Sequence, residues 1–205
     1  MAVVWTIAGE AGKAVDATPR SLPSLSADGC EIDFQSLDSD VMRWNIPLES
    51  KDNTAMVPDQ GQRITLFRDG VRYFTGIVTV RRITYDGQKY QAEIEVEGPW
   101  WWLKQIPLSS NIPDQAGESS ERTAFVFPTG SPRTSLIALI YRAIELGAPI
   151  SEGPIASCFS VPRLSLRNVP FSEAIAELMR WIADGMVYFD YSVEGHPALC
   201  MQRRG

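Results

Sequence analysis

Acidic side chains are the residues of this chain whose spacing could do chemistry. Glu93, Glu95 and Glu97 alternate along a segment rich in β-forming residues, so a strand would present all three on one face. Paired carboxylates can perform general acid–base work, as in glycoside hydrolases, but nothing in the sequence selects one pair. Glu173 and Glu177 lie one helical turn apart. The spacing favours solvated charged faces over a catalytic pair.

Other catalytic signatures are missing from the sequence. The one histidine, His196, stands beside a proline, and no Gly-x-Ser-x-Gly elbow, Walker loop or His-Glu-x-x-His motif is present. Cys30, Cys158 and Cys200 are widely spaced and odd in number, which favours buried reduced thiols over a disulfide framework or a zinc site. We therefore expect no enzyme activity, no cofactor and no metal.

A run of three tryptophans, Trp100, Trp101 and Trp102, is the most unusual local feature. Aromatic platforms can stack sugars or bases. Large aromatic residues at a corner between a sheet and a helix more often fill a core or an interface. We interpret these three residues as a candidate interface, in which at least one ring meets a partner. Trp181 is expected to pack against adjoining strands.

Composition and charge limit the function classes. The chain has 205 residues, 44% hydrophobic and 21% charged, which is enough for one large domain or two small ones. Its net charge is −6: residues 1–98 hold 10 basic against 15 acidic residues, and residues 99–205 hold 9 against 10. Specific nucleic-acid recognition normally needs a basic face, so we do not expect it. No apolar run approaches the ~20 residues of a membrane-spanning helix.

Two Asp-Gly dipeptides, Asp69-Gly70 and Asp86-Gly87, must position the three glutamates. Asp-Gly between β-rich segments is a strong hairpin signal, because a type I′ turn needs positive φ at both central residues. The pattern predicts a three-stranded meander over 61–68, 71–85 and 88–97. Gly76 is a predicted bulge or kink. In the third strand Tyr90, Ala92, Ile94 and Val96 are predicted to face inward.

Further elements follow from alternation and from helix signals. Strands are predicted over 3–8, 28–36 and 41–46, where Pro47 should weaken the last one. A helical turn is predicted over 100–105, a polar loop over 109–120, a short strand over 123–128 and extended chain over 159–166. Helices are predicted over about 132–146, capped by Ser131 and Gly147, and about 171–183. Closing strands are predicted over 186–191 and 197–202.

These elements predict an α+β fold with two domains. Residues 1–98 form an antiparallel, β-barrel-like domain, and residues 99–205 form a smaller α+β domain with two main helices. The sequence shows no internal repeat and no low-complexity segment.

The order of these elements resembles a known superfamily. Residues 61–108, from the meander through the tryptophan run, resemble the first β-barrel of phage tail hub proteins. Residues 164–192, with Trp181 near the helix end and Phe189-Asp190-Tyr191 ending a strand, resemble their α+β portion, as does the following segment 196–204. This is the baseplate hub superfamily, which includes the late control protein D family and the base of the type VI secretion spike.

The resemblance implies a structural role in a phage or prophage-derived tail tip. Such hubs form a homo-oligomeric ring, expected to be a trimer, that continues the tail tube. A central channel passes DNA and the tape measure protein. Implied partners are other tail proteins: the tail tube or distal tail protein, the tape measure, and a spike or fibre. The implied location is the virion tail, assembled in the bacterial host cytoplasm, without a membrane.

Members of this superfamily are usually longer, with a second barrel-like domain after the α+β part. We therefore expect this chain to be a fragment, or one piece of a split hub. We also expect Glu93, Glu95 and Glu97 to face the channel, because an acidic wall lets duplex DNA slide. Two alternatives stay open: a carbohydrate-binding module built on the tryptophan run, and a small cell-wall hydrolase.

Overall fold

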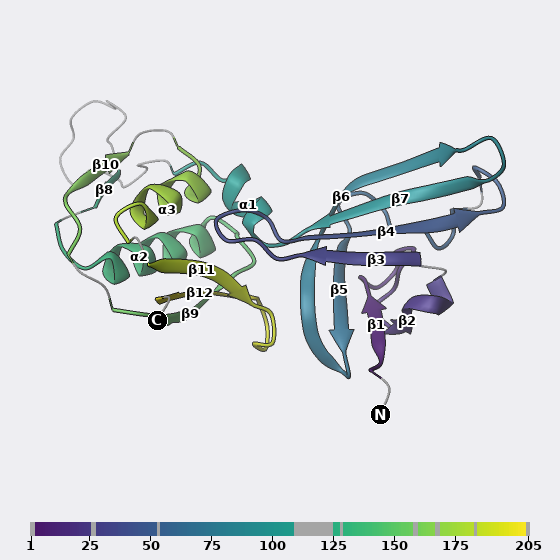
Figure 1. Ribbon diagram of the computed structural model, residues 1–205, viewed down its shortest axis with the longest axis horizontal. Coiled ribbons are helices and arrows are strands. Elements are labelled where there is room, and N and C mark those ends of the chain that lie inside the picture. Colours follow the sequence, from purple (N-terminus) through teal and green to yellow (C-terminus); the bar gives the residue numbers. More distant parts are fainter. Residues whose placement is uncertain are drawn as a thin grey trace. The chain divides into compact units, whose positions relative to one another are not determined.

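The architecture is that of a computed structural model of the chain (Figure 1). It describes residues 3–25, 28–52, 54–108, 125–127, 129–157, 160–166, 169–182 and 184–203. Several expectations fall wholly or partly outside the described residues: the polar loop over 109–120, the surroundings of Cys158, the ends of the strand predicted over 123–128, the start of the extended chain over 159–166 and the last residue of the helix over 171–183.

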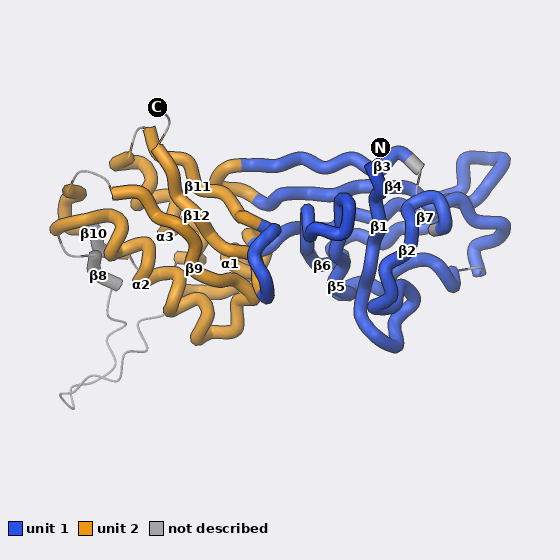
Figure 2. Tube along the Cα trace, turned by 90° about the horizontal axis from the view of Figure 1, so that it is seen from below, with its two compact units in different colours: residues 1–35, 39–99, 191–195 blue, residues 36–38, 100–190, 196–205 orange. Residues whose placement is uncertain are grey.

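The chain forms two compact units (Figure 2). Unit 1 contains residues 1–35, 39–99 and 191–195, and unit 2 contains residues 36–38, 100–190 and 196–205. Each unit thus includes a short segment from the other side of residue 99. The predicted domain boundary between residues 98 and 99 stays a prediction.

Unit 1 is built on a seven-stranded antiparallel sheet that curls into a half-barrel (Figure 1). The strands lie in the order β2-β1-β5-β6-β7-β4-β3. Their bounds are β1 Trp5–Ala8, β2 Arg20–Ser21, β3 Asp28–Asp33, β4 Val41–Leu48, β5 Arg63–Arg68, β6 Val71–Tyr85 and β7 Tyr90–Glu97, with a short 3-10 helix η1 over Leu22–Leu25. The prediction of an α+β fold that begins with an antiparallel barrel-like sheet is confirmed.

The two Asp-Gly turns differ. Asp69 and Gly70 have φ of 51° and 80°, so both adopt the left-handed conformation that a type I′ turn requires. In the second hairpin Tyr85 pairs with Tyr90, which leaves a four-residue connection in which Gly87 but not Asp86 has positive φ. The Asp86 carboxylate accepts hydrogen bonds from two backbone N–H groups of this turn, so side-chain bonding replaces the expected type I′ geometry.

Gly76 permits the close approach of β6 and β7, and the bulges lie on either side of it. Its pairing with Ile64 is regular, whereas register shifts occur between Leu66 and Phe67 and between Val78 and Val80. A Cβ at Gly76 would lie 2.2 Å from the carbonyl oxygen of Glu97. Glycine is therefore needed here for backbone contact, and the prediction of a bulge at this residue was wrong.

Strand β4 runs through Pro47, contrary to the expectation that the proline would weaken it. Pro47 pairs with Gln91 on the β7 side, while the pairing of β4 with β3 ends at Asn45. Pro47 thus lies beyond the β3 ladder, where its missing N–H removes no hydrogen bond.

One face of the sheet forms the core of unit 1. Its side chains come from five strands and are at most 3% exposed: Ile7, Met42, Trp44, Ile46, Leu66, Phe74, Val78, Ala92, Ile94 and Val96. Burying each of the larger ones stabilises the fold by roughly 1.5–3 kcal/mol. The alternation predicted for β7 is confirmed, since Ala92, Ile94 and Val96 lie on this face.

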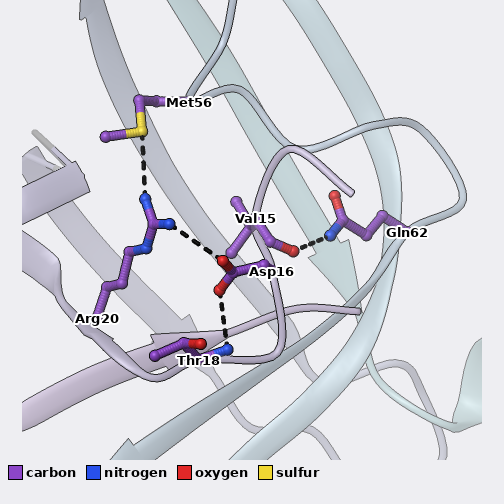
Figure 3. Close-up of polar contacts among 6 residues, drawn as sticks. All are labelled: Val15, Asp16, Thr18, Arg20, Met56 and Gln62. Atoms are coloured by element: carbon purple, nitrogen blue, oxygen red, sulfur yellow. Dashed lines mark hydrogen bonds and ion pairs between the residues drawn. The ribbon is translucent and has the colours of Figure 1, made fainter. Parts of the chain in front are cut away.

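The loop between β1 and β2 is fixed by polar contacts (Figure 3). Asp16 accepts a hydrogen bond from the Thr18 N–H at 2.8 Å and forms an ion pair with Arg20 at 3.2 Å. The backbone bond from Thr18 is the main reason why the pKa of Asp16 is lowered. The side-chain amide of Gln62 donates to the Val15 carbonyl and holds the loop against β5.

Unit 2 packs helices beside a small mixed sheet. The helices are α1 Trp100–Gln105, α2 Pro132–Glu145 and α3 Phe171–Met179. The strands are β8 Phe125–Phe127, β9 Ser151–Ile155, β10 Leu164–Leu166, β11 Gly185–Asp190 and β12 Ala198–Arg203. Strand β12 lies between β11, to which it is antiparallel, and β9, to which it is parallel, while β8 pairs with β10.

Two details of the helices differ from the sequence predictions. Ser131 occupies the N-cap of α2 without a side-chain capping bond. On the outer face of α2, Tyr141 is 54% exposed and its hydroxyl bonds to Glu152, which raises the pKa of Tyr141. Helix α3 ends at Met179, and the following turn leaves Trp181 56% exposed. Its predicted packing against strands is therefore wrong.

Candidate interaction face of the half-barrel

The three predicted glutamates lie on the sheet face opposite the core. Because Ala92, Ile94 and Val96 are buried on one side of β7, the intervening Glu93, Glu95 and Glu97 project to the other. Strand pairing places Arg43 on β4 opposite Glu95 and Arg82 on β6 opposite Glu93. The face therefore carries both signs of charge.

Ion pairs cross this charged face from strand to strand. The Arg43 guanidinium contacts Glu95 at 2.7 Å and Asp33 at 3.4 Å, and Arg82 lies 3.9 Å from Glu93. The hydrogen bond with Glu95 is the main cause of a raised Arg43 pKa. Glu95 is half-buried and the other four side chains are exposed, so each pair contributes at most about 1 kcal/mol to stability.

The charged face keeps a negative balance after this pairing. Its described charged residues on β3, β4, β6 and β7 are Glu31, Asp33, Arg43, Arg82, Glu93, Glu95 and Glu97. Five carboxylates against two guanidinium groups give a local charge of −3. The face is also hollowed, with a cavity volume of about 630 Å³ bounded by the side chains of β3, β4, β6 and β7. Such a surface repels polyanions and accepts cations.

The tryptophan run does not form a flat platform. Trp100 is 2% exposed and packs edge-on against Phe189, with ring centroids 6.3 Å apart, so it belongs to the core of unit 2. Trp101 and Trp102 are partly exposed and meet at 88° with centroids 5.4 Å apart. Sugars and bases stack on exposed ring faces, which a perpendicular pair offers poorly. The interface role predicted for these residues stays a prediction.

The remaining candidate groups are scattered. His196 is exposed in the loop before β12, and its backbone carbonyl accepts a bond from Ser151. Cys30 and Cys200 are free thiols, one partly buried and one buried. Among the described residues, no three His, Cys, Asp or Glu side chains gather as metal ligands would.

Sequence reasoning missed the arginines and the second group of acids. Arg43, Arg82, Glu31 and Asp33 join the three predicted glutamates only through strand pairing. Alternation in β3 and β4 places each residue on a face, but which residues stand opposite one another depends on register. The signal that could have found these residues is the alternation of charged with apolar residues in β3 and β4, which places the charged side chains on one face of each strand.

In the described part of the chain, two edges of the sheet offer six-residue stretches for further pairing. Strand β3 is the last strand on one side. The last strand on the other side is the two-residue β2, and β6 adds a second open stretch because it extends past β5. Strand β5 pairs with β6 as far as Ile77, and backbone bonds from the preceding loop reach Val78, so residues 80–85 of β6 pair only with β7. Unpaired strand edges are templates for further strands.

This curled α+β fold is that of phage tail proteins. The chain superimposes on the prophage MuSo2 43 kDa tail protein from Shewanella oneidensis with a TM-score of 0.64 and 13% identity, covering 100% of this chain and 56% of that one. For prophage tail protein gp18 from Listeria monocytogenes the TM-score is 0.58 at 10% identity, covering 98% and 50%. A type VI secretion component from E. coli, described as similar to phage T4 tail proteins gp27 and gp5, gives 0.50 at 9% identity, covering 85% and 47%.

These similarities establish the fold that the resemblance implied. The chain spans about half the length of the solved structures that it matches. No protein-family model matches the sequence, and no curated protein matches it either. None of the helices in the described residues has the length and apolar character to cross a bilayer.

Proposed function

We propose that this protein is a structural component of a phage or prophage-derived tail tip, a baseplate hub whose copies form a ring that continues the tail tube. The observation that carries the proposal is the fold, which matches a prophage tail protein over the whole chain. Its partners are further copies and other tail proteins, and its place is the virion tail. The charged face of the half-barrel lines the channel through which DNA passes.

The two open sheet edges support assembly of copies edge to edge. Strand β3 has six residues, and the unpaired stretch 80–85 of β6 also has six. Between them lie β7 and β4, so each copy contributes four strands in the order β6-β7-β4-β3. Because all neighbours in this set are antiparallel, β3 of one copy lies antiparallel to β6 of the next when copies are related by rotation. The repeat can therefore close into a ring.

The charges of the two edges are complementary. Glu31 and Asp33 on β3 and Arg82 on β6 lie on the charged face, because they pair in register with Arg43, Val41 and Glu93. Arg81 pairs with Ile94 and lies on the opposite face. Opposite charges on facing strands stabilise pairing by roughly 0.2–1 kcal/mol each.

The proposed ring places the charged face on one side of a continuous sheet. With Glu93, Glu95 and Glu97 facing the channel, its wall is negative, with the local charge of −3 repeated in each copy. Duplex DNA carries one charge per ~1.7 Å, so such a wall repels it and offers no binding sites along the path.

Disulfide trapping tests the ring. A Glu31→Cys/Arg82→Cys protein, with all three native cysteines replaced by serine, should give cross-linked dimers and a closed species of three copies under mild oxidation. The pairs Glu31→Cys/Val80→Cys and Glu31→Cys/Thr84→Cys, displaced by two residues on the same face, cover the alternative registers, since a disulfide needs Cα atoms about 4.4–6.8 Å apart. Light scattering of the unmodified protein gives the mass without cross-links.

The matched control is Glu31→Cys/Glu10→Cys, in which the second cysteine lies on an exposed loop off the edge. Equal cross-linking in control and test proteins would reject the edge junction. A protein that stays monomeric at every concentration, alone and with its tail partners, would reject the ring itself.

A further inference from the structure

Residues 191–195 belong to unit 1, although the strands on either side of them belong to unit 2. Asp190 ends β11 and pairs with Ala198, the first residue of β12. The loop between them enters unit 1 at Tyr191 and leaves it after Gly195. A hairpin loop needs only two to five residues, so its seven-residue length calls for another explanation.

Tyr191 anchors one end of this segment in the core of unit 1. Its side chain is 4% exposed, and its hydroxyl donates a hydrogen bond of 2.5 Å to the Asp40 carboxylate. Its ring contacts Phe74 and Phe34, with centroids 5.4 and 6.2 Å away. Gly98 leaves room for the hydroxyl, because a Cβ there would lie 2.6 Å from the phenol oxygen.

Asp40 connects Tyr191 to two other parts of unit 1. Its Oδ1 accepts a bond of 2.7 Å from the Gln35 N–H, and its carbonyl accepts one of 2.8 Å from the Gly98 N–H. Burial raises the pKa of the Asp40 carboxyl, and burial beside Asp40 raises that of Tyr191 well above its usual value. The bond between the two groups therefore satisfies a buried donor and a buried acceptor that would be costly to leave apart.

The other end of the segment is held at the surface. Arg72 on β6 donates a hydrogen bond of 2.5 Å from Nη1 to the Gly195 carbonyl. This bond is solvent-exposed, in contrast to the buried bond at Tyr191. The segment therefore has a strong inner attachment and a weak outer one.

We infer that residues 191–195 form a strap, attached to Asp40 at one end and to Arg72 at the other, that opens as one piece, independently of the rest of the sheet. When it opens, the Asp40 carboxylate and the faces of Phe34 and Phe74 that Tyr191 covers become accessible. The amides of Gln35 and Gly98, which bond to Asp40, lose their protection together. Segments held by a few bonds can open locally without global unfolding. This inference is independent of the proposed function.

Hydrogen exchange of the full chain tests the strap. In Tyr191→Phe the Gln35 amide should exchange at least about tenfold faster, because the Asp40 carboxylate that it bonds to loses the phenol donor. The Gly98 amide, which bonds to the Asp40 backbone carbonyl, should accelerate with it, because both amides become exposed in the same opening. Arg72→Ala should accelerate exchange over 192–195 with a smaller effect at Gln35 and Gly98. Amides of the β4–β7 ladder should keep their rates in both variants.

Tyr85→Phe is the matched control, since the Tyr85 hydroxyl bonds to the Gly87 carbonyl in an exposed turn of the same unit. Rates at Gln35 and Gly98 that change no more in Tyr191→Phe than in Tyr85→Phe would overturn the strap. Equal acceleration of the β4–β7 ladder would also overturn it, because the segment would then open only with the whole sheet.

Discussion

At the scale of single residues, the pKa of the Cys30 thiol shows how strongly the edge strand β3 shields this side chain. Burial is the main cause that raises its pKa to about 11, and the neighbouring Glu31 adds to the effect. The thiolate is the reactive species, so a rise of about two pKa units lowers reactivity near neutral pH by roughly a hundredfold. Cys30 therefore behaves as a structural residue of β3.

We predict slow alkylation of Cys30 in a protein with Cys158→Ser and Cys200→Ser. The rate with iodoacetamide at pH 8 should be about a hundredfold below that of the same protein in urea, and it should rise with pH until about 11. Mass spectrometry over time gives both rates. Equal rates in buffer and in urea would show that the thiol is not shielded.

At the scale of elements, the close approach of β6 and β7 depends on the absence of a side chain at Gly76. A Cβ there would meet the Glu97 carbonyl carbon at 2.7 Å as well as its oxygen, and backbone atoms cannot move aside as a flexible side chain can. The sheet would have to open between β6 and β7, the two strands that carry Arg82 and the three glutamates.

We predict that Gly76→Ala lowers the free energy of unfolding by about 3 kcal/mol, as overpacking in a closely packed site does. Val71→Ala, at a 57% exposed position of the same strand, should change it by less than about 0.5 kcal/mol. Urea unfolding followed by circular dichroism measures both. A Gly76→Ala protein as stable as the Val71→Ala protein would contradict the close approach.

The sequence predicts an element well when nearby residues determine it, and poorly when pairing with a distant strand determines it. The limits of β6 and the Asp69-Gly70 turn follow from nearby residues, and both were predicted correctly. Strand β9, with glycine and proline in its five residues, was missed because it forms only by pairing with β12 nearly fifty positions away. The partners of Glu95 and Glu93 were missed for the same reason, since register is set between strands.

At the scale of the whole molecule, charge decides how the proposed channel treats DNA. Replacing Glu93, Glu95 and Glu97 by lysine adds six charges, which takes the net charge from −6 to 0 and concentrates the change on one face. Lysines on a channel wall would hold duplex DNA through its phosphates, with an affinity that falls steeply as salt rises.

We predict that this triple-lysine protein gains salt-dependent retention of duplex DNA in a gel-shift assay at 50 mM salt. The control protein carries Glu10→Lys, Glu49→Lys and Asp52→Lys, which add the same six charges at exposed positions elsewhere on unit 1. Circular dichroism confirms that both are folded. If the control binds DNA as strongly as the test protein, total charge alone explains the binding, and the proposed place of the three glutamates on a channel wall is contradicted.

Because each unit contains residues from both sides of residue 99, the two units cannot be produced separately by one cut in the gene. A gene cut after residue 99 yields two products, and neither contains all of its unit, because residues 36–38 and 191–195 are encoded on opposite sides of the cut. The amino-terminal product lacks Tyr191, so its Asp40 loses the phenol donor and is a candidate for aggregation when made alone. Split halves of this chain should therefore be produced together, so that each can complement the other.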